Sequence, residues 1–333
     1  MPSNYPTLKD ISAEAGVSMA LVSVVLNGKK SRIKASPATR ERILRAAEKF
    51  GYEPDRNARA LRMSRSFLIG VLAYDISSSF VPKILAGIEN GFLHTDYSVL
   101  PISYRDGDEL ARCLETFRRR KIDGLIIIST GFQNFPEGLS MWNRIAKVFI
   151  GCSPSLDCTS SVHTDSFAVG ALAAEAFLRR SCRKFMYLTY ANSRNITGWG
   201  HTLAAAGVPE GNCLTVKTVF DFDKSMRKVT DVLQAHPDID CIFADSDWIA
   251  AAALKAADKI GRRIPEDLQL IGVDDSPVCL ITSPPLSSIW QPKVEQGEIA
   301  AKLMLRMLDE NQMENLVLPV RLTVRESLKP LEE

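Results

Sequence analysis

Apolar residues recur at helical spacing in three short stretches near the start of the chain. The first stretch begins after Thr7, a good helix N-cap, and ends at Gly16, which suits the left-handed conformation that closes helices. The second begins after Ser18, the third begins after Ser36, and Gly51 ends the third. Two short helices joined by a turn of about three to four residues that contains glycine predict a helix-turn-helix, whose second helix fits the major groove of DNA. A three-helix scaffold that binds nothing has the same pattern.

From residue 66 onward, short runs of Val, Ile, Leu and Phe alternate with stretches of helical spacing. After a first strand that begins at 66, the runs predict strands at 97–102, 123–129, 148–151, 184–189, 241–244 and 269–272. The helical stretches are 82–92, 109–120, 167–180, 224–235 and 249–260. This alternation predicts mostly parallel sheets covered on both faces. Two such sheets place the carboxyl ends of their strands around a shared cleft, the usual position of a ligand.

Charge is unevenly distributed along the 333 residues. Residues 1–66 carry a net charge of +7, whereas the remainder carries −5. A basic head suggests that this part of the chain meets a polyanion. The first residues lack the pattern of a signal peptide, and no run of about 18 apolar residues occurs. We therefore expect a cytoplasmic protein without a membrane segment.

The sequence contains none of the common catalytic or metal-binding motifs. The seven cysteines have no CxxC spacing and the four histidines are scattered, which predicts reduced thiols and no metal site. There is no GxSxG, no HExxH, no GxxxxGK[ST], and no GxGxxG after a strand. We therefore expect a protein that is not an enzyme and that uses no cofactor.

A dense motif fills the first sixty residues. It reads T-L-x-D-I-x-x-x-A-G-V-S-x-x-x-V-S-x-V-L-N, followed by S-x-x-T-R-E-R-I and G-Y-x-P-x-x-x-A-R-x-L. This motif resembles that of the lactose-repressor/galactose-repressor (LacI/GalR) family of transcriptional regulators. The resemblance implies a first helix at about 7–14, a recognition helix at 18–26 and a support helix at 36–50.

The resemblance also implies three groups of DNA contacts. Phosphate contacts are expected at short hydroxyl and amide groups and one phenol, namely Thr7, Ser18, Ser23, Asn27, Ser36 and Tyr52. Met19, Ala20 and Val24 take the positions that read bases, where none can make a bidentate bond to guanine but all can touch a thymine methyl. Residues 55–66 resemble a hinge helix that orders over a minor groove when two copies meet, with Asn57, Ala58 and the wedge Leu61 in contact with DNA. An exposed linker helix is the alternative for this segment.

Further landmarks extend the resemblance over nearly the whole chain. They include D-I-S-S-S-F at 75–80, A-D-S-D-W-I-A at 244–250, R-I-P-E-D-L-Q-L-I-G-V-D-D at 263–275 and L-P-V-R-L-T-V-R-E-S at 318–327. The implied fold is an all-α helix-turn-helix head plus an α/β two-lobed, periplasmic-binding-protein-like body with mostly parallel sheets. The expected parts are a DNA-binding domain at 1–54, a hinge at 55–66, and an effector-binding and dimerisation domain at 67–333. Within the body we expect an N-lobe of about 67–160 plus 290–320 and a C-lobe of about 161–289 plus 321–333.

The expected effector site gathers aromatic, amide and charged side chains from the ends of strands. By their positions relative to the family, the candidates are Phe80, Tyr104, Arg105, Arg194, Asn195, Phe222, Ser246 and Asp274. Carboxylate and amide groups beside stacking aromatics suit a polyol such as a sugar, because one carboxylate accepts from two neighbouring hydroxyls. Asn195 stands where the family often has Arg, which favours an uncharged sugar unless Arg194 replaces that charge. The alternatives are core packing for the aromatics, including Trp199, Trp248 and Trp290, and helix capping for Asp274.

The predicted function is therefore that of a transcriptional regulator, most simply a repressor of carbohydrate-utilisation genes. It is expected to bind a pseudo-palindromic double-stranded DNA operator as a homodimer, under the control of a small sugar-like effector held between the lobes. Two alternatives stay open, namely a regulator without effector control and a sugar-binding protein with no role on DNA.

Overall fold

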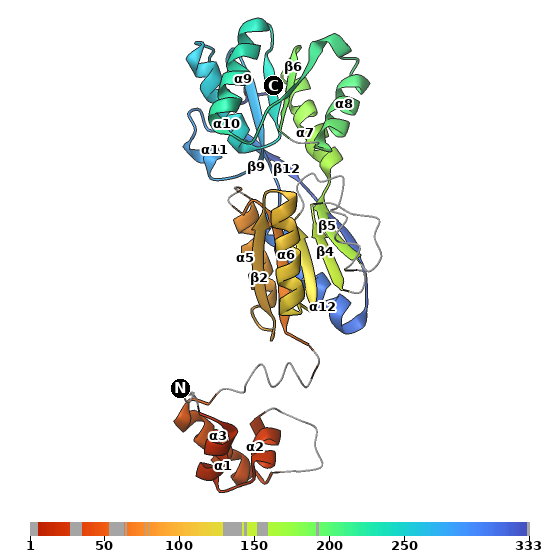
Figure 1. Ribbon diagram of the computed structural model, residues 1–333. Helices are drawn as coiled ribbons and strands as arrows, with labels where there is room; N and C mark the ends of the chain where they lie inside the picture. Colours follow the sequence, from red (N-terminus) through yellow and green to blue (C-terminus); the bar gives the residue numbers. More distant parts are fainter. Residues whose placement is uncertain are drawn as a thin grey trace. The chain divides into compact units, whose positions relative to one another are not determined.

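The computed structural model describes residues 6–26, 35–52, 63, 65–76, 78, 80–128, 142, 145–151, 159–190 and 193–331. The chain divides into two compact units, Met1–Ser66 and Phe67–Glu333, each with its own core (Figure 1). We call the first unit the head and the second the body, and describe each separately.

Three helices form the described part of the head, as the sequence predicts: α1 (Leu8–Ala15), α2 (Met19–Leu26) and α3 (Pro37–Phe50). The cap of α1 is a reciprocal contact in which Asp10 Oδ2 accepts from both the amide and the hydroxyl of Thr7, at 2.7 Å each. Gly16 ends α1 with a φ of 61°, the left-handed conformation that glycine adopts without steric cost. Ile11, Val22 and Ile43, one from each helix, are fully buried against one another.

The body is built on two six-stranded sheets. The first sheet is entirely parallel, with the order β11-β5-β4-β3-β1-β2. Its strands are β1 (Leu68–Tyr74), β2 (Ser98–Tyr104), β3 (Gly124–Ile128), β4 (Ala146–Ile150), β5 (Thr159–Thr164) and β11 (Asn315–Leu318). The second sheet has the order β12-β10-β9-β8-β6-β7 and is parallel except for its edge strand β12. Its strands are β6 (Phe185–Thr189), β7 (Cys213–Lys217), β8 (Cys241–Ala244), β9 (Gln269–Asp274), β10 (Ser287–Trp290) and β12 (Arg321–Thr323).

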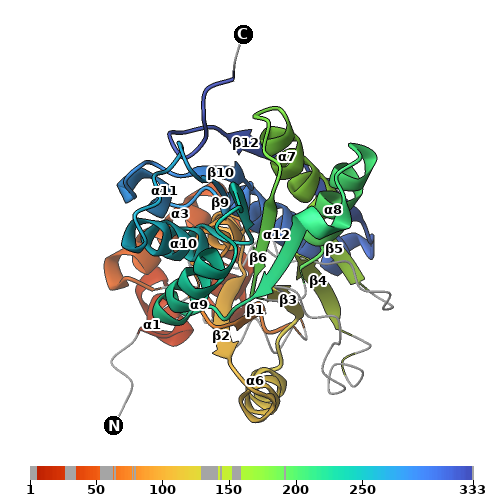
Figure 2. The same cartoon turned by 90° about the horizontal axis from the view of Figure 1, so that it is seen from above.

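Helices cover both faces of each sheet, as strand–helix alternation predicts. The first sheet packs against α5 (Val81–Phe92) and α12 (Lys293–Glu310) on one face and α6 (Gly107–Arg120) on the other. In the second lobe, α7 (Ser166–Leu178) and α8 (Asn195–Ala205) lie on one side of the sheet, and α9 (Phe222–Ala235) and α10 (Asp247–Lys259) lie on the other (Figure 2). A 3-10 turn (Glu210–Asn212) and the short α11 (Val278–Ile281) complete this lobe. None of these described helices is long and apolar enough to cross a membrane.

Helices α5 and α12 approach so closely that their contact requires glycine. A β-carbon on Gly87 would lie 2.0 Å from the carbonyl oxygen of Val294, and one on Gly297 would lie 2.2 Å from that of Ile84. The two helix backbones therefore touch, which fixes the first turn of α12 against the first lobe.

The chain passes between the lobes three times, after β5, after β10 and after β11. The expected boundary at about 160 falls inside β5, which stays in the first sheet as far as Thr164. This strand was not predicted because its buried residues include Ser160 and Ser161, which read as loop. Both hydroxyls are satisfied by the segment around β11: Ser161 Oγ donates to Asn315 Oδ1 at 2.8 Å, and Ser160 Oγ accepts from the amide of Glu314 at 3.1 Å.

Candidate functional sites

The start of α2 is exposed to solvent. Ser18, Met19 and Ala20 are exposed, with 53% of Met19 accessible, whereas Val22 and Val25 on the opposite side are buried in the core. Ser18 also caps the helix, since its Oγ accepts from the amide of Leu21 at 3.3 Å. A short helix that buries one face and presents small and unbranched side chains at its N-terminus can enter a groove of DNA.

The other expected DNA contacts of the head differ in how open they are. Thr7 and Ser36 are exposed at the starts of α1 and α3, whereas Ser23, Val24 and Tyr52 are half-buried. Ser36 Oγ accepts from the amide of Thr39 at 3.2 Å, so this hydroxyl both caps α3 and faces solvent. Four expected contacts, Asn27, Asn57, Ala58 and Leu61, lie outside the described residues.

In the body, Asp274 lies at the carboxyl end of β9 and forms an ion pair with Lys293. Asp274 Oδ1 and Lys293 Nζ are 3.0 Å apart, and the two side chains are only 11% and 12% exposed. Lys293 Nζ also donates to Gln291 Oε1 at 2.8 Å and lies 5.1 Å from the centre of the Phe80 ring. The expected ligand acid and the expected aromatic platform are thus brought together by Lys293, a residue that the sequence analysis did not single out. Phe80 itself is 7% exposed within the core of the first lobe.

A second carboxylate, Asp245, follows β8 and organises the expected amide. Asp245 Oδ1 accepts from the hydroxyl of Tyr187 at 2.5 Å and from Nδ2 of Asn195 at 3.0 Å. Burial raises the pKa of Asp245, and the hydrogen bonds that it accepts oppose this shift. The side chain of Asn195 is therefore oriented by Asp245, which the sequence analysis did not single out.

Some of the remaining effector-site candidates are buried with partners inside the chain, and others are exposed to solvent. Arg194 is exposed, and its charge, after the larger effect of burial, lowers the pKa of His163 on β5. Arg105 is exposed and lies 3.6 Å from Asp75. Tyr104 is buried and packs edge-on against the partly exposed Tyr74, and burial raises the pKa of Tyr104 to about 12. Ser246 is buried and caps α10 by accepting from the amide of Ile249 at 3.3 Å.

The tryptophans and Phe222 also have different environments. Phe222, at the start of α9, is half-buried and packs edge-on against Trp248, with ring centres 5.3 Å apart. Trp248 remains 38% exposed, so this aromatic pair is open to a ligand. Trp199 is 3% exposed within a cluster of aromatic rings, as the packing alternative predicted. The guanidinium of Arg321 lies 4.1 Å from the ring centre of Trp290.

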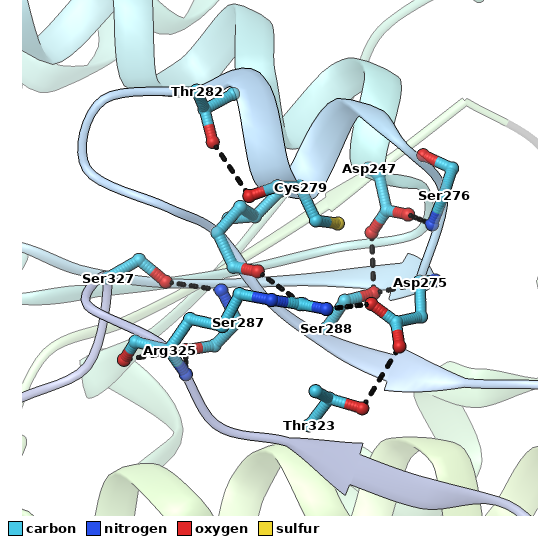
Figure 3. Close-up of polar contacts among 11 residues, drawn as sticks. Asp247, Asp275, Ser276, Cys279, Thr282, Ser287, Ser288, Thr323, Arg325 and Ser327 are labelled. Atoms are coloured by element: carbon cyan, nitrogen blue, oxygen red, sulfur yellow. Dashed lines mark hydrogen bonds and ion pairs between the residues drawn. The ribbon is translucent and has the colours of Figure 1, made fainter.

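A polar network that the sequence analysis missed surrounds Asp275, the residue that follows Asp274 in the chain (Figure 3). Arg325 donates to Asp275 Oδ1 at 2.6 Å and to the carbonyl of Leu286 at 2.8 Å. Thr323 Oγ1 donates to the second oxygen of Asp275 at 3.1 Å. Ser288 Oγ accepts from the amide of Asp275 at 3.0 Å and donates to Asp247 Oδ1 at 2.5 Å. The turn after β9 is thereby tied to β10, β12 and the start of α10.

The same network perturbs Asp247 and holds a strained turn. Burial, and then the nearby charge of Asp274, raise the pKa of Asp247 to about 6. Asp274 and Asp275 have positive φ angles of 103° and 49°, which are rare for residues with side chains. Such strain persists where surrounding contacts determine the backbone, and here it directs the Asp274 carboxylate toward Lys293.

Among the described residues, one group of side chains has the residue types and spacing that a metal ion could use. Cys182, Asp240 and Cys241 place one potential ligand atom each within 4.8 Å of the others. However, Cys182 Sγ accepts from Gln269 Nε2 at 3.0 Å. The Asp240 carboxylate accepts from the amides of Arg183 and Lys184, at 2.8 and 3.0 Å. These hydrogen bonds give the cluster a structural role, which is to hold the segment before β6 in place.

Comparison with known proteins agrees with both units. Residues 7–55 match the family model for bacterial regulatory proteins of the lacI family, and residues 154–328 match that of a periplasmic binding protein-like domain. The ribose operon repressor of Halalkalibacterium halodurans is 29% identical over 333 residues, which cover 97% of each chain. The regulator CelR of Thermobifida fusca is 28% identical, covering 97% of this chain and 98% of its own.

Solved structures show the same architecture over the whole length. A CelR–cellobiose complex has 27% sequence identity and a TM-score of 0.73, covering 97% of this chain and 99% of that one. A lac repressor dimer bound to operator and the anti-inducer ONPF has 22% identity and a TM-score of 0.86, covering 98% and 100%. The second model match spans just over half of the chain, and the first coincides with the helix-turn-helix. The chain therefore belongs to the lacI family of bacterial regulatory proteins, with a helix-turn-helix head followed by a periplasmic-binding-protein-like body.

Proposed function

We propose that this protein is a sequence-specific DNA-binding repressor of carbohydrate-utilisation genes, controlled by a small uncharged sugar bound in the body. The observation that carries the proposal is that one chain combines two features. The start of the recognition helix α2 is exposed, and the ion pair between Asp274 and Lys293 at the strand ends of the body is largely buried. Solved relatives hold cellobiose and, in a structure 26% identical to this chain, ribose. As a DNA-binding regulator it acts in the cytoplasm.

The proposed division of labour follows the two units. Residues 1–54 bind DNA, 55–66 form the hinge, and 67–333 bind the effector and dimerise. The proposed DNA contacts are Thr7, Ser18, Met19, Ala20, Ser23, Val24, Asn27, Ser36, Tyr52, Asn57, Ala58 and Leu61. The proposed effector contacts are Phe80, Tyr104, Arg105, Arg194, Asn195, Phe222, Ser246 and Asp274.

Homodimerisation is proposed to use the apolar surface of α11. Leu280 and Ile281 are 67% and 82% exposed, although their neighbour Cys279 is fully buried. Large apolar side chains exposed side by side mark an interaction surface more often than a solvated one. Ile281→Asp should convert a dimer to a monomer in analytical ultracentrifugation, whereas the same substitution at the exposed Leu93 on the first lobe should leave the dimer intact.

The DNA-binding part is tested by selection of the full-length protein on random duplexes. A dimer should enrich a pseudo-palindrome, and its affinity should fall with salt with a log–log slope of about −0.9 per phosphate contacted. Absence of salt-sensitive binding in that selection would refute the proposal.

The effector part is tested by thermal shift against a panel of neutral sugars, followed by operator binding with the sugar found. Asp274→Ala should abolish the sugar-induced shift and leave operator binding in the absence of sugar intact. Because coupling is reciprocal, the sugar must change operator affinity by the factor by which operator changes sugar affinity. A regulator without effector control is the second candidate, since Asp274 and Asn195 both already have partners within the chain. Sugar-independent operator binding across the panel would favour it.

A further inference from the structure

The ion pair between Asp274 and Lys293 joins the two lobes of the body. Asp274 ends β9 in the second sheet, whereas Lys293 is the first residue of α12, whose helix packs on α5 and the first sheet. The backbone contact between Gly87 and Gly297 holds the first turns of α12 in place. Lys293 is therefore a fixed cation presented by one lobe to a carboxylate presented by the other.

The ammonium group of Lys293 is fully engaged. Its neighbours are Asp274 Oδ1 at 3.0 Å, Gln291 Oε1 at 2.8 Å and the face of the Phe80 ring at 5.1 Å. Gln291 is itself oriented by Thr164, whose Oγ1 donates to Gln291 Oε1 at 3.2 Å. A primary ammonium has three donor hydrogens, and two acceptors plus an aromatic face account for them.

The neighbouring charged groups would not offset the loss of either charge of the Asp274–Lys293 pair. Asp275 is already neutralised by Arg325 at 2.6 Å. Asp245 and Asp247 are buried carboxyls with raised pKa values, and the charge of Asp274 contributes to the shift of Asp247. Removal of the Lys293 charge therefore leaves Asp274 beside other acidic groups without its counter-ion, whereas removal of the Asp274 charge leaves Lys293 without its own.

A neutral pair with little solvent contact discriminates among ligands by their charge. An uncharged polyol can donate a hydroxyl to Asp274, whose carboxylate has acceptor capacity beyond its contact with Lys293, and the pair stays balanced. A sugar acid must compete with Asp274 for Lys293 and then leaves that carboxylate uncompensated at low exposure, which is costly. An amino sugar is disfavoured for the converse reason, because its ammonium group displaces Lys293 from Asp274 and leaves the charge of Lys293 uncompensated.

We propose that Lys293 is a specificity-determining residue that, through its cross-lobe pair with Asp274, makes the effector site select uncharged polyols over both sugar acids and amino sugars. This inference rests on the proposed function, because it assumes that the effector binds beside Asp274. It assigns charge selection to Lys293, a residue outside the set predicted from the sequence, and not to Arg194 or Asn195.

The test measures calorimetric affinities for two matched series, glucose, glucosamine and glucuronate, and galactose, galactosamine and galacturonate. The full-length wild type should bind the neutral member of one series best. Lys293→Met keeps the length of the stem and should raise the affinity ratio of amino to neutral sugar by about tenfold or more, and Asp274→Asn should raise the ratio of acid to neutral sugar likewise. Lys293→Arg keeps the charge and should retain the wild-type order of preference. Lys302→Met, the same substitution at an exposed position of α12, should change neither ratio.

The outcomes separate the inference from the proposed function. Unchanged ratios in Lys293→Met, with wild-type binding of the neutral sugar, would overturn the inference and leave the regulator intact. A wild type that prefers the acid or the amine would overturn it as well. A wild type that binds no member of either series while it binds operator would overturn the proposed sugar effector and the inference together.

Discussion

Arg325 should stabilise the body more than any exposed arginine, because it fixes the turn that carries Asp274. Arg325→Met removes an ion pair to Asp275 of 2.6 Å between side chains that are 17% and 14% exposed, and it leaves the carbonyl of Leu286 without its donor at 2.8 Å. Removing one partner of a buried pair costs about 3–5 kcal/mol, and the remaining solvent contact places this pair near the lower end, at about 3 kcal/mol. For a unit of this size that corresponds to a fall in Tm of roughly 6–12 °C.

The assay is urea unfolding of the full-length protein followed by tryptophan fluorescence. All four tryptophans lie beyond residue 140, so the signal reports the body without interference from the head. Arg325→Met, Asp275→Asn and the double variant form a cycle, in which we expect a coupling energy of at least about 2 kcal/mol. The matched control is Arg179→Met, whose pair with Glu175 spans 3.6 Å between side chains that are 68% and 48% exposed and should contribute less than about 1 kcal/mol. Additive effects of the two single substitutions would refute the reasoning.

Three further predictions concern pH and DNA. The pKa of Asp247 is raised from 3.8 to about 6, so the folded state binds a proton that the unfolded state has lost, and stability should fall by up to about 3 kcal/mol as the pH rises from 4 to 7. Asp247→Asn should lack this slope in urea titrations, and equal slopes in both proteins would place the titration elsewhere. Val24→Arg and Met19→Tyr should each change the preferred half-site in a duplex selection, since one bidentate contact with a base discriminates by about 1–3 kcal/mol. An unchanged consensus sequence would show that these residues do not contact the bases. Leu61→Ala should weaken operator binding far more than binding to random DNA, because only the operator repays the unstacking that a wedge requires, and equal losses would make Leu61 an ordinary linker residue.

The parts of the fold that the sequence predicts well are those with local signals. The helices of the head begin after Thr7, Ser18 and Ser36, and α1 and α3 end at Gly16 and Gly51, because capping is decided within a few residues. The hydrophobic strands β3, β6 and β8 were likewise visible as apolar runs. Overall architecture follows from such elements, since alternating strands and helices leave few ways to cover both faces of a sheet.

The missed strands carry polar residues whose partners lie far away in the sequence. In β10, Ser287 and Ser288 are fully buried, yet they bind Arg325 and Asp247, which lie about 40 residues away. A buried serine is indistinguishable from a loop serine until its partner is known. The same limit on sequence-based prediction applies to the candidate site. Position relative to the family selected Asp274 and Asn195, but the partners Lys293 and Asp245 are set by topology, which brings strand ends from both lobes together.

The three passages of the chain between the lobes have a consequence for synthesis. The core of the head lies entirely between Leu8 and Tyr52, so it can fold as soon as those residues leave the ribosome. The first lobe cannot close until α12 and then β11, which ends at Leu318, have emerged about 270 residues later. From the end of α5 at Phe92 to the end of α12 at Glu310 the chain grows by about 220 residues, which takes ~11–44 s at roughly 5–20 residues per second, and during this time α5 lacks the helix that its glycine contacts. A nascent chain released in that interval would carry a finished DNA-binding head on a body with an open apolar face, the kind of surface that makes incomplete chains prone to aggregate.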